Sequence, residues 1–170
     1  MHDLLDPFAA LIGAWQGEGA GEYPTIDSFT YAEEITFADI TGKPLLAYES
    51  TTKALDDGRT LHVESGFLRA QPEGGVELIV AHGFGVVEIS SGSMINGLMR
   101  LGSDIMRPSS TAKVVEATTR RYELSHDAGL DVLSYEISME AAGHPMTHHL
   151  RARLERVRTP RPKTQRGPGR

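Results

Sequence analysis

Residues 45–83 read LLAYESTTKALDDGRTLHVESGFLRAQPEGGVELIVAHG, and this stretch decides the fold class. Three segments rich in apolar and β-branched residues, 45–55, 60–71 and 76–83, are separated by the turn sequences DDGR and PEGG. Short runs of this kind joined by Gly-containing turns are typical of strands connected as hairpins. The stretch therefore predicts three consecutive antiparallel strands.

The same pattern extends in both directions. Upstream, SFTYAEEITFADI places Phe29, Tyr31, Ile35 and Phe37 on one phase before the turn TGKP. Downstream, five more strands are predicted: GVVEISSG, SMINGLMRL, AKVVEATTRRYEL, DVLSYEISMEA and HHLRARLERV. The turn SHDAG separates the third of these from the fourth. No helix is long enough to cross between parallel strands, so we expect an all-β, antiparallel up-and-down barrel of about ten strands. A barrel of that size leaves room for a ligand cavity.

One short N-terminal helix is also predicted. Asp6 is a candidate cap, Pro7 suits a first helical position, and Phe8, Leu11 and Ile12 repeat at helical spacing.

Length and charge narrow the function classes. A chain of 170 residues suits one domain, which we assign to residues 1–158. The last twelve residues, 159–170, hold four basic residues, no acid and no apolar side chain, and are expected to be a disordered tail that folding does not need. Because those four charges are part of the total of −6, residues 1–158 carry −10, which disfavours nucleic acid as a partner.

The remaining composition points to a cytoplasmic protein. There is no cysteine, no apolar run long enough for a membrane helix, and no basic segment of a signal peptide at the start. We therefore expect no disulfide, no thiolate metal site and no membrane partner.

The predicted first strand has its own signature. GAWQGEGAGEYPTI, residues 13–26, arranges Gly13, Trp15, Gly17 and Gly19 as G-x-W-x-G-x-G. Glycines in a strand allow a close approach of backbone or ligand, and a lone Trp can plug the closed end of a barrel.

This signature resembles the nitrobindins, which are haem-binding barrels. The likeness also covers FTYAEEITF, GKPLLAYESTT, LHVESGFLR, VELIVAHGFGVVEI, TAKVV and MEAAGHPMTHHLRARLER. The resemblance implies a ten-stranded barrel that holds one haem b per chain at an open end, with a single histidine as the protein's axial ligand. It also implies nitric oxide binding and, in the ferric form, isomerisation of peroxynitrite to nitrate. A homodimer is one of the oligomeric states left open.

Three of the chain's seven histidines lie in GHPMTHHLRARLERV, residues 143–157. The resemblance selects His149 as the axial ligand and makes His144 and His148 loop or surface residues. Strand phase alone does not select His149, which shares a phase with Arg151 and Arg153, so a bend near GHPMT is needed to aim it inward. An alternative zinc site of His144, His148 and His149 is disfavoured, because their spacing suits a helix and no H-E-x-x-H pattern accompanies them.

Other candidates lie elsewhere along the chain. By resemblance, Leu61, His62 and Met139 border the haem pocket, although Met139 would serve equally well as core. Thr25 and Lys113 match positions that contact a propionate or the ring edge.

His82 is a candidate from its own strand. It keeps phase with the apolar residues of VELIVAHG and is therefore expected to face the cavity. The alternative for His62 and His82 is that both are satisfied polar residues at the barrel rim.

Two functions compete. The first is a haem-dependent peroxynitrite isomerase with His149 on the iron. The second is a carrier of fatty acid or another small apolar ligand, which commonly uses buried arginines. Arg120 and Arg121 are adjacent, so at least one of them must point outward in a regular strand.

Overall fold

The computed structural model describes residues 1–158, and the predicted tail lies outside the described residues. Ten strands and two short 3₁₀ helices make up this part. Their order is η1 (Asp3–Leu11), β1 (Gly13–Tyr23), β2 (Ile26–Asp39), β3 (Leu45–Ala54), β4 (Thr60–Ala70), η2 (Pro72–Gly74), β5 (Gly75–His82), β6 (Val86–Ile95), β7 (Leu98–Pro108), β8 (Val115–Asp127), β9 (Leu130–Ala141) and β10 (His144–Arg156).

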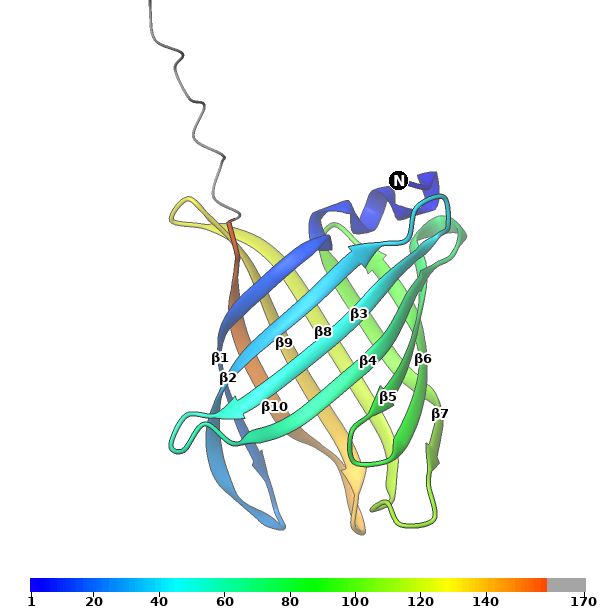
Figure 1. The fold of residues 1–170 in the computed structure, drawn as a ribbon. Coiled ribbons are helices and arrows are strands. Elements are labelled where there is room, and N and C mark those ends of the chain that lie inside the picture. Colours follow the sequence, from blue (N-terminus) through cyan, green and yellow to red (C-terminus); the bar gives the residue numbers. More distant parts are fainter. Residues whose placement is uncertain (159–170) are drawn as a thin grey trace, which may run out of the picture.

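The strands form one closed barrel (Figure 1). Each strand pairs antiparallel with its neighbours in sequence, and β1 closes the ring against β10, with Gly17 opposite Leu154. The predicted all-β barrel of about ten strands is confirmed. Within residues 1–158, no helix is long and apolar enough to cross a membrane.

The hairpin between β6 and β7 differs from the prediction. The turn lies at Asn96 and Gly97, whereas GVVEISSG and SMINGLMRL were expected to be separate strands. Both turn residues have positive φ, 50° and 79°, as in a two-residue hairpin turn for which Asn-Gly is strongly preferred. The Asn-Gly pair therefore ends β6, and the residues before it belong to one continuous strand.

The N-terminal helix closes one end of the barrel (Figure 1). It begins at Asp3 and contains Pro7, and the His2 side chain accepts a hydrogen bond from the Leu4 backbone N–H, so the predicted cap at Asp6 is wrong. Its side chains Leu5, Phe8 and Leu11 are fully buried.

Trp15 packs beneath this helix as predicted. Its side chain is fully buried within the same core cluster, and its indole N–H donates to the Leu11 carbonyl at 2.8 Å. The Arg156 guanidinium lies 4.2 Å from the ring centroid on its face. Trp15 is therefore the packing centre of the closed end.

Two glycines of the same motif allow close packing around β1. A Cβ at Gly17 would overlap the backbone carbonyl of Arg153 on β10, and one at Gly19 would overlap the Tyr31 ring. Any side chain at Gly17 would push apart the strands that close the barrel.

Candidate functional site

The opposite end of the barrel opens into a cavity of about 680 Å³. The β1–β2, β3–β4 and β5–β6 hairpins lie at this end, on the side away from η1 (Figure 1), and contribute Asp27, Asp56 and Phe84 to the cavity lining. The volume falls within the usual range of small-molecule sites, about 300–1,000 Å³. Its apolar walls are formed by Ile26, Phe29, Leu61, Phe84, Met106, Val115, Ile137, Met139 and Leu150. The predicted ligand cavity is thus present.

His149 faces this cavity because β10 carries a bulge. His148 pairs with Ser138 and Leu150 pairs with Ile137, so His149 has no partner on β9. An extra residue of this kind breaks the alternation of side chains. As a result, the consecutive residues His149 and Leu150 both line the cavity.

The His149 ring is held in one tautomer. Its Nδ1–H donates to the Glu22 carbonyl of β1 at 2.9 Å, and a carbonyl can only accept. Nε2 therefore carries the lone pair, and it has no hydrogen-bond partner among residues 1–158. Burial lowers the pKa of His149, against the opposing effect of the Glu22 bond, so the imidazole is neutral at pH 7.

Aromatic rings surround His149. Tyr23 and Phe29 meet its ring edge-on, with centroids 5.6 and 6.4 Å away. The Tyr23 hydroxyl donates to the Ala141 carbonyl at 3.1 Å, which ties β1 to β9 beside the bulge. These contacts fix the plane of the imidazole.

The cavity wall opposite His149 carries two more histidines. His62 on β4 and His82 on β5 both line the cavity, and β5 lies five strands from β10 in either direction around the ring. Their rings are 5.3 Å apart, and Phe84 lies 5.2 Å from each. His149 and His82 therefore approach the cavity from opposite sides.

A buried charge network continues from His82 into the barrel. The Arg120 guanidinium donates to both oxygens of Glu64, at 2.9 and 3.0 Å, and to both of Glu88, at 2.7 and 3.0 Å. His82 Nε2 lies 3.0 Å from Glu88. Burial alone would raise the pKa of Glu64 and Glu88, but the Arg120 charge and these hydrogen bonds hold both well below the usual range.

The pKa of His82 moves in the opposite direction. Burial lowers it, but the carboxylates of Glu64 and Glu88 outweigh burial and raise the pKa overall. The histidine is thus drawn toward the charged state by its two acidic neighbours.

A third buried acid, Glu33, lies in a separate hydrogen-bond network of the interior. Glu33 accepts hydrogen bonds from Tyr135 at 2.7 Å and Ser50 at 2.8 Å, and Tyr135 in turn contacts Tyr31. Burial raises the pKa of Glu33 to about 7, although both hydrogen bonds oppose the shift. Glu33 therefore titrates near neutral pH.

The predicted site residues fall into two groups. Leu61, His62, His82, Met139 and His149 line one cavity. Thr25 and Lys113 do not line it. Both are exposed and lie in the β1–β2 and β7–β8 connections, at the same open end of the barrel (Figure 1).

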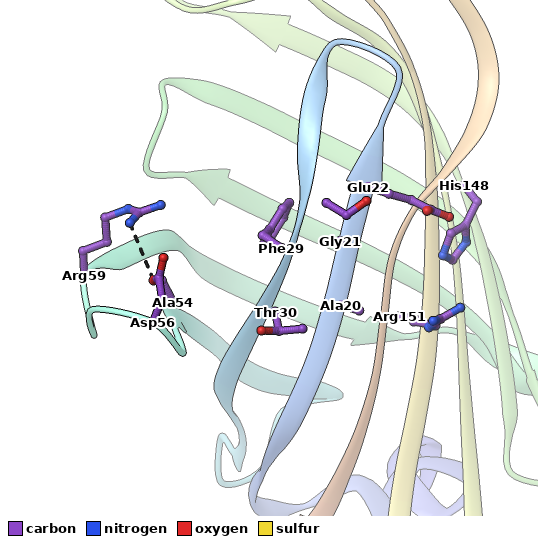
Figure 2. A pocket seen from close by; sticks show the side chains of 11 residues that line it. Ala20, Gly21, Glu22, Phe29, Thr30, Ala54, Asp56, Arg59, His148 and Arg151 are labelled. Atoms are coloured by element: carbon purple, nitrogen blue, oxygen red, sulfur yellow. Dashed lines mark ion pairs between the residues drawn. The ribbon is translucent and has the colours of Figure 1, made fainter.

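His148 lies outside the cavity, although it is the neighbour of His149. It lines a shallower hollow of about 470 Å³ beside the β1–β2 hairpin. Figure 2 shows His148 and Arg151 on one side of this hairpin, and on the other side Arg59 paired with Asp56 at 3.7 Å.

The alternative zinc site of His144, His148 and His149 is wrong. In residues 1–158 the one group of histidine and carboxylate ligand atoms that converges is His62, Glu64 and His82, with all atoms within 4.8 Å of one another. The bulge turns the side chains of His148 and His149 into different hollows, so the three histidines do not converge on one ion.

Sequence reasoning missed Glu33, Glu64 and Glu88, and it considered Arg120 only as a possible clamp for a lipid carboxylate. Each keeps phase with buried apolar neighbours on its strand, so alternation was the available signal. Charged side chains are seldom buried unless they are paired, and the pairing partners lie on other strands, Arg120 being 56 residues from Glu64.

Fold and cavity together define a ligand-binding β-barrel with an oriented, neutral histidine in an apolar mouth. The sequence profile described as "THAP4-like, heme-binding beta-barrel domain" matches residues 4–156. The chain belongs to this haem-binding barrel family.

Several relatives cover nearly the whole chain. Peroxynitrite isomerase 2 of Mycobacterium ulcerans is 44% identical over 162 residues, which are 92% of this chain and 96% of the relative. Peroxynitrite isomerase of Nocardia farcinica is 42% identical over 160 residues, 92% of each chain. The crystal structure of Rv2717c from M. tuberculosis superposes with a TM-score of 0.83 at 40% identity, covering 92% of this chain and 98% of the other.

The cavity suits the family's cofactor. Haem needs a flat apolar enclosure and a neutral imidazole nitrogen for its iron. The Glu22 bond leaves His149 Nε2 with the lone pair, and apolar side chains such as Phe29, Met139 and Leu150 flank it.

Proposed function

We propose that this chain binds haem b through His149, isomerises peroxynitrite to nitrate, and binds nitric oxide at the same iron. The observation that carries the proposal is the single-tautomer His149, whose Nε2 is left free by the Nδ1–H bond to Glu22. The names of relatives at 42–44% identity support the substrate. When bound, haem supplies a redox-active iron with one coordination position for a small ligand.

The chain contributes orientation and electronic tuning. Donation from Nδ1–H to a carbonyl raises the basicity of the other ring nitrogen and prevents rotation of the ring. The edge contacts of Tyr23 and Phe29 restrict the same motion. Because burial lowers the pKa of His149, protonation does not compete with ligation at neutral pH.

The chain also shapes the opposite face of the cavity. Apolar side chains including Leu61 and Phe84 limit water, while His62 offers a polar nitrogen. Isomerisation moves no proton overall, so a general base is not required.

The fatty-acid carrier is disfavoured by the state of Arg120. Its side chain is almost fully buried, as a lipid-carboxylate clamp requires, but Glu64 and Glu88 already occupy its donors. Arg121 points outward and pairs with Glu123 at 2.6 Å. Both guanidinium groups are therefore already paired with glutamates, and neither is available to bind a lipid carboxylate.

Haem reconstitution of His149→Ala tests the proposal. The variant should fold, because the side chain is only partly buried, but it should lose the histidine-ligated Soret spectrum and the conversion of peroxynitrite to nitrate. Added imidazole should restore part of the spectrum by occupying the vacated space. Absorption spectra, nitric oxide titration and nitrate yield are the measurements.

His148→Ala is the matched control, since it changes the adjacent histidine outside the cavity and should behave as the parent protein. The proposal would be falsified if folded His149→Ala bound haem with an unchanged spectrum and kept its activity. It would also fail if His148→Ala showed the loss instead.

A further inference from the structure

Three ligand atoms form a nearly equilateral triangle in the wall opposite His149. His62 Nε2 lies 3.2 Å from His82 Nδ1 and 3.3 Å from Glu64 Oε1, and His82 Nδ1 lies 3.3 Å from the same oxygen. A tetrahedral zinc ion with ligands at about 2.0–2.1 Å needs ligand atoms about 3.3–3.4 Å apart. The triangle therefore has the dimensions of one face of a zinc coordination tetrahedron.

The tautomer of His82 leaves one edge of this triangle without a hydrogen. His82 Nε2 lies 3.0 Å from the Glu88 carboxylate, which can only accept, so Nε2 carries the hydrogen. In the neutral ring, Nδ1 presents a lone pair to Glu64 Oε1, which is itself an acceptor. This contact is satisfied either by a second proton on His82 or by a metal ion among the three atoms, and the ion also accounts for the matching position of His62 Nε2.

The surroundings supply the matching charge. Glu64 and Glu88 carry two negative charges and Arg120 one positive charge, so neutral histidines leave the cluster at −1. The side chains of Glu64 and His82 are 8% and 5% exposed, which limits screening by water. His62 is 24% exposed and gives the triangle access from the cavity.

The partners behind the triangle orient its ligands. Glu88 holds His82, while Tyr48 donates to Glu64 Oε2 at 2.7 Å and Arg120 donates to both Glu64 oxygens, which fixes the carboxylate with Oε1 toward the histidines. A carboxylate behind a ligating imidazole is the usual arrangement at zinc sites. Two imidazoles, one carboxylate and an open fourth position also match zinc sites that bind water or substrate.

We infer that His62, Glu64 and His82 form a zinc(II) site, separate from the haem ligand His149 and on the opposite side of the same cavity. The site goes beyond the proposed function and does not depend on it. Its open position faces the cavity, so the ion would hold water or a small anion opposite His149.

Cobalt(II), a spectroscopic substitute for zinc, provides the test. The haem-free full-length protein is titrated with Co²⁺ at pH 7.5, and we expect one ion per chain with the intense visible bands of four-coordinate cobalt. Added Zn²⁺ should remove these bands by displacement. His62→Gln and His82→Gln should each weaken Co²⁺ binding by at least about 100-fold, because even partners that only orient a ligand contribute about 10–100-fold.

His149→Ala is the control that separates this site from haem binding. It should retain the cobalt spectrum although it loses haem, and circular dichroism of each variant reports folding. Absence of bound Co²⁺ would overturn the inference and assign the triangle to a proton shared with His82. Cobalt bands that persist in both Gln variants but disappear in His149→Ala would also overturn it, by placing the ion at the mouth histidines.

Discussion

At the scale of single residues, His149 owes its direction to one unpaired backbone position. Without the bulge, His148 would share the inward phase of Leu150 and Ala152, and His149 would point out with Arg151. Because of the bulge, His149 faces the cavity and His148 does not. The bond to Glu22 then fixes which ring nitrogen faces the cavity. Position and tautomer are set by different strands, β10 and β1.

Trp15 is the residue whose loss should cost most at the closed end. Trp15→Ala removes a fully buried ring that contacts η1 and Arg156, and core Trp truncations cost about 3–5 kcal/mol. We expect this loss in both haem-free and haem-loaded protein, measured by urea unfolding. An unchanged free energy of unfolding in the haem-free protein would contradict the packing role.

Glu33 should make stability depend on pH near neutrality. Its folded pKa of about 7 exceeds the ordinary 4.5, so the folded state retains a proton that the unfolded chain releases between these values. Its contribution is fully present below pH 4.5 and is lost as pH rises through 7. At about 1.4 kcal/mol per pKa unit, the loss over these 2.5 units is on the order of 3–4 kcal/mol.

Glu33→Gln isolates this effect from His82, which titrates in the same direction. The parent protein should lose more stability than Glu33→Gln between pH 5 and pH 8 in urea unfolding. Equal losses in the two proteins would show that Glu33 does not retain its proton.

At the scale of elements, turns explain how much the sequence predicts. Strands bounded by Asp- and Gly-containing turns, such as β4, were identified because the turn chemistry is local. The β6–β7 boundary was misplaced because serine and glycine at 90–93 look like a turn, although Asn96 and Gly97 form it. A bend was expected near GHPMT, residues 143–147, but His144–Thr147 belongs to β10, since the turn residues are Ala142 and Gly143, at φ 53° and 78°.

Gly97→Ala should weaken the β6–β7 hairpin. Gly97 has a φ of +79°, where a side chain costs about 1–2 kcal/mol. Gly102→Ala is the matched control, because Gly102 lies on β7 with a φ outside the left-handed region and nothing within 4 Å of an added Cβ. Thermal unfolding should show a lower melting temperature for Gly97→Ala alone, and equal shifts would contradict the turn assignment.

At the scale of the whole molecule, the barrel was predictable and its polar interior was not. Ten hairpin-connected segments with one apolar face leave few arrangements without free edges, so closure followed from the pattern. The partnership of Glu64 and Glu88 with Arg120 is set by contacts among β4, β6 and β8, which no local pattern encodes. The candidate site was located by resemblance through His149 and His62 and by strand phase through His82, whereas the charge network behind His82 became visible only in three dimensions.

The pairing of β1 with β10 also sets the order of events during synthesis. The backbone carbonyl that orients His149 comes from β1, the first strand of the barrel to be made, and His149 itself comes from β10. Pairing of such distant segments is slow compared with hairpin formation. Until β10 has paired with β1, the chain therefore lacks the oriented imidazole, and any cofactor that uses it must enter a barrel that has already closed.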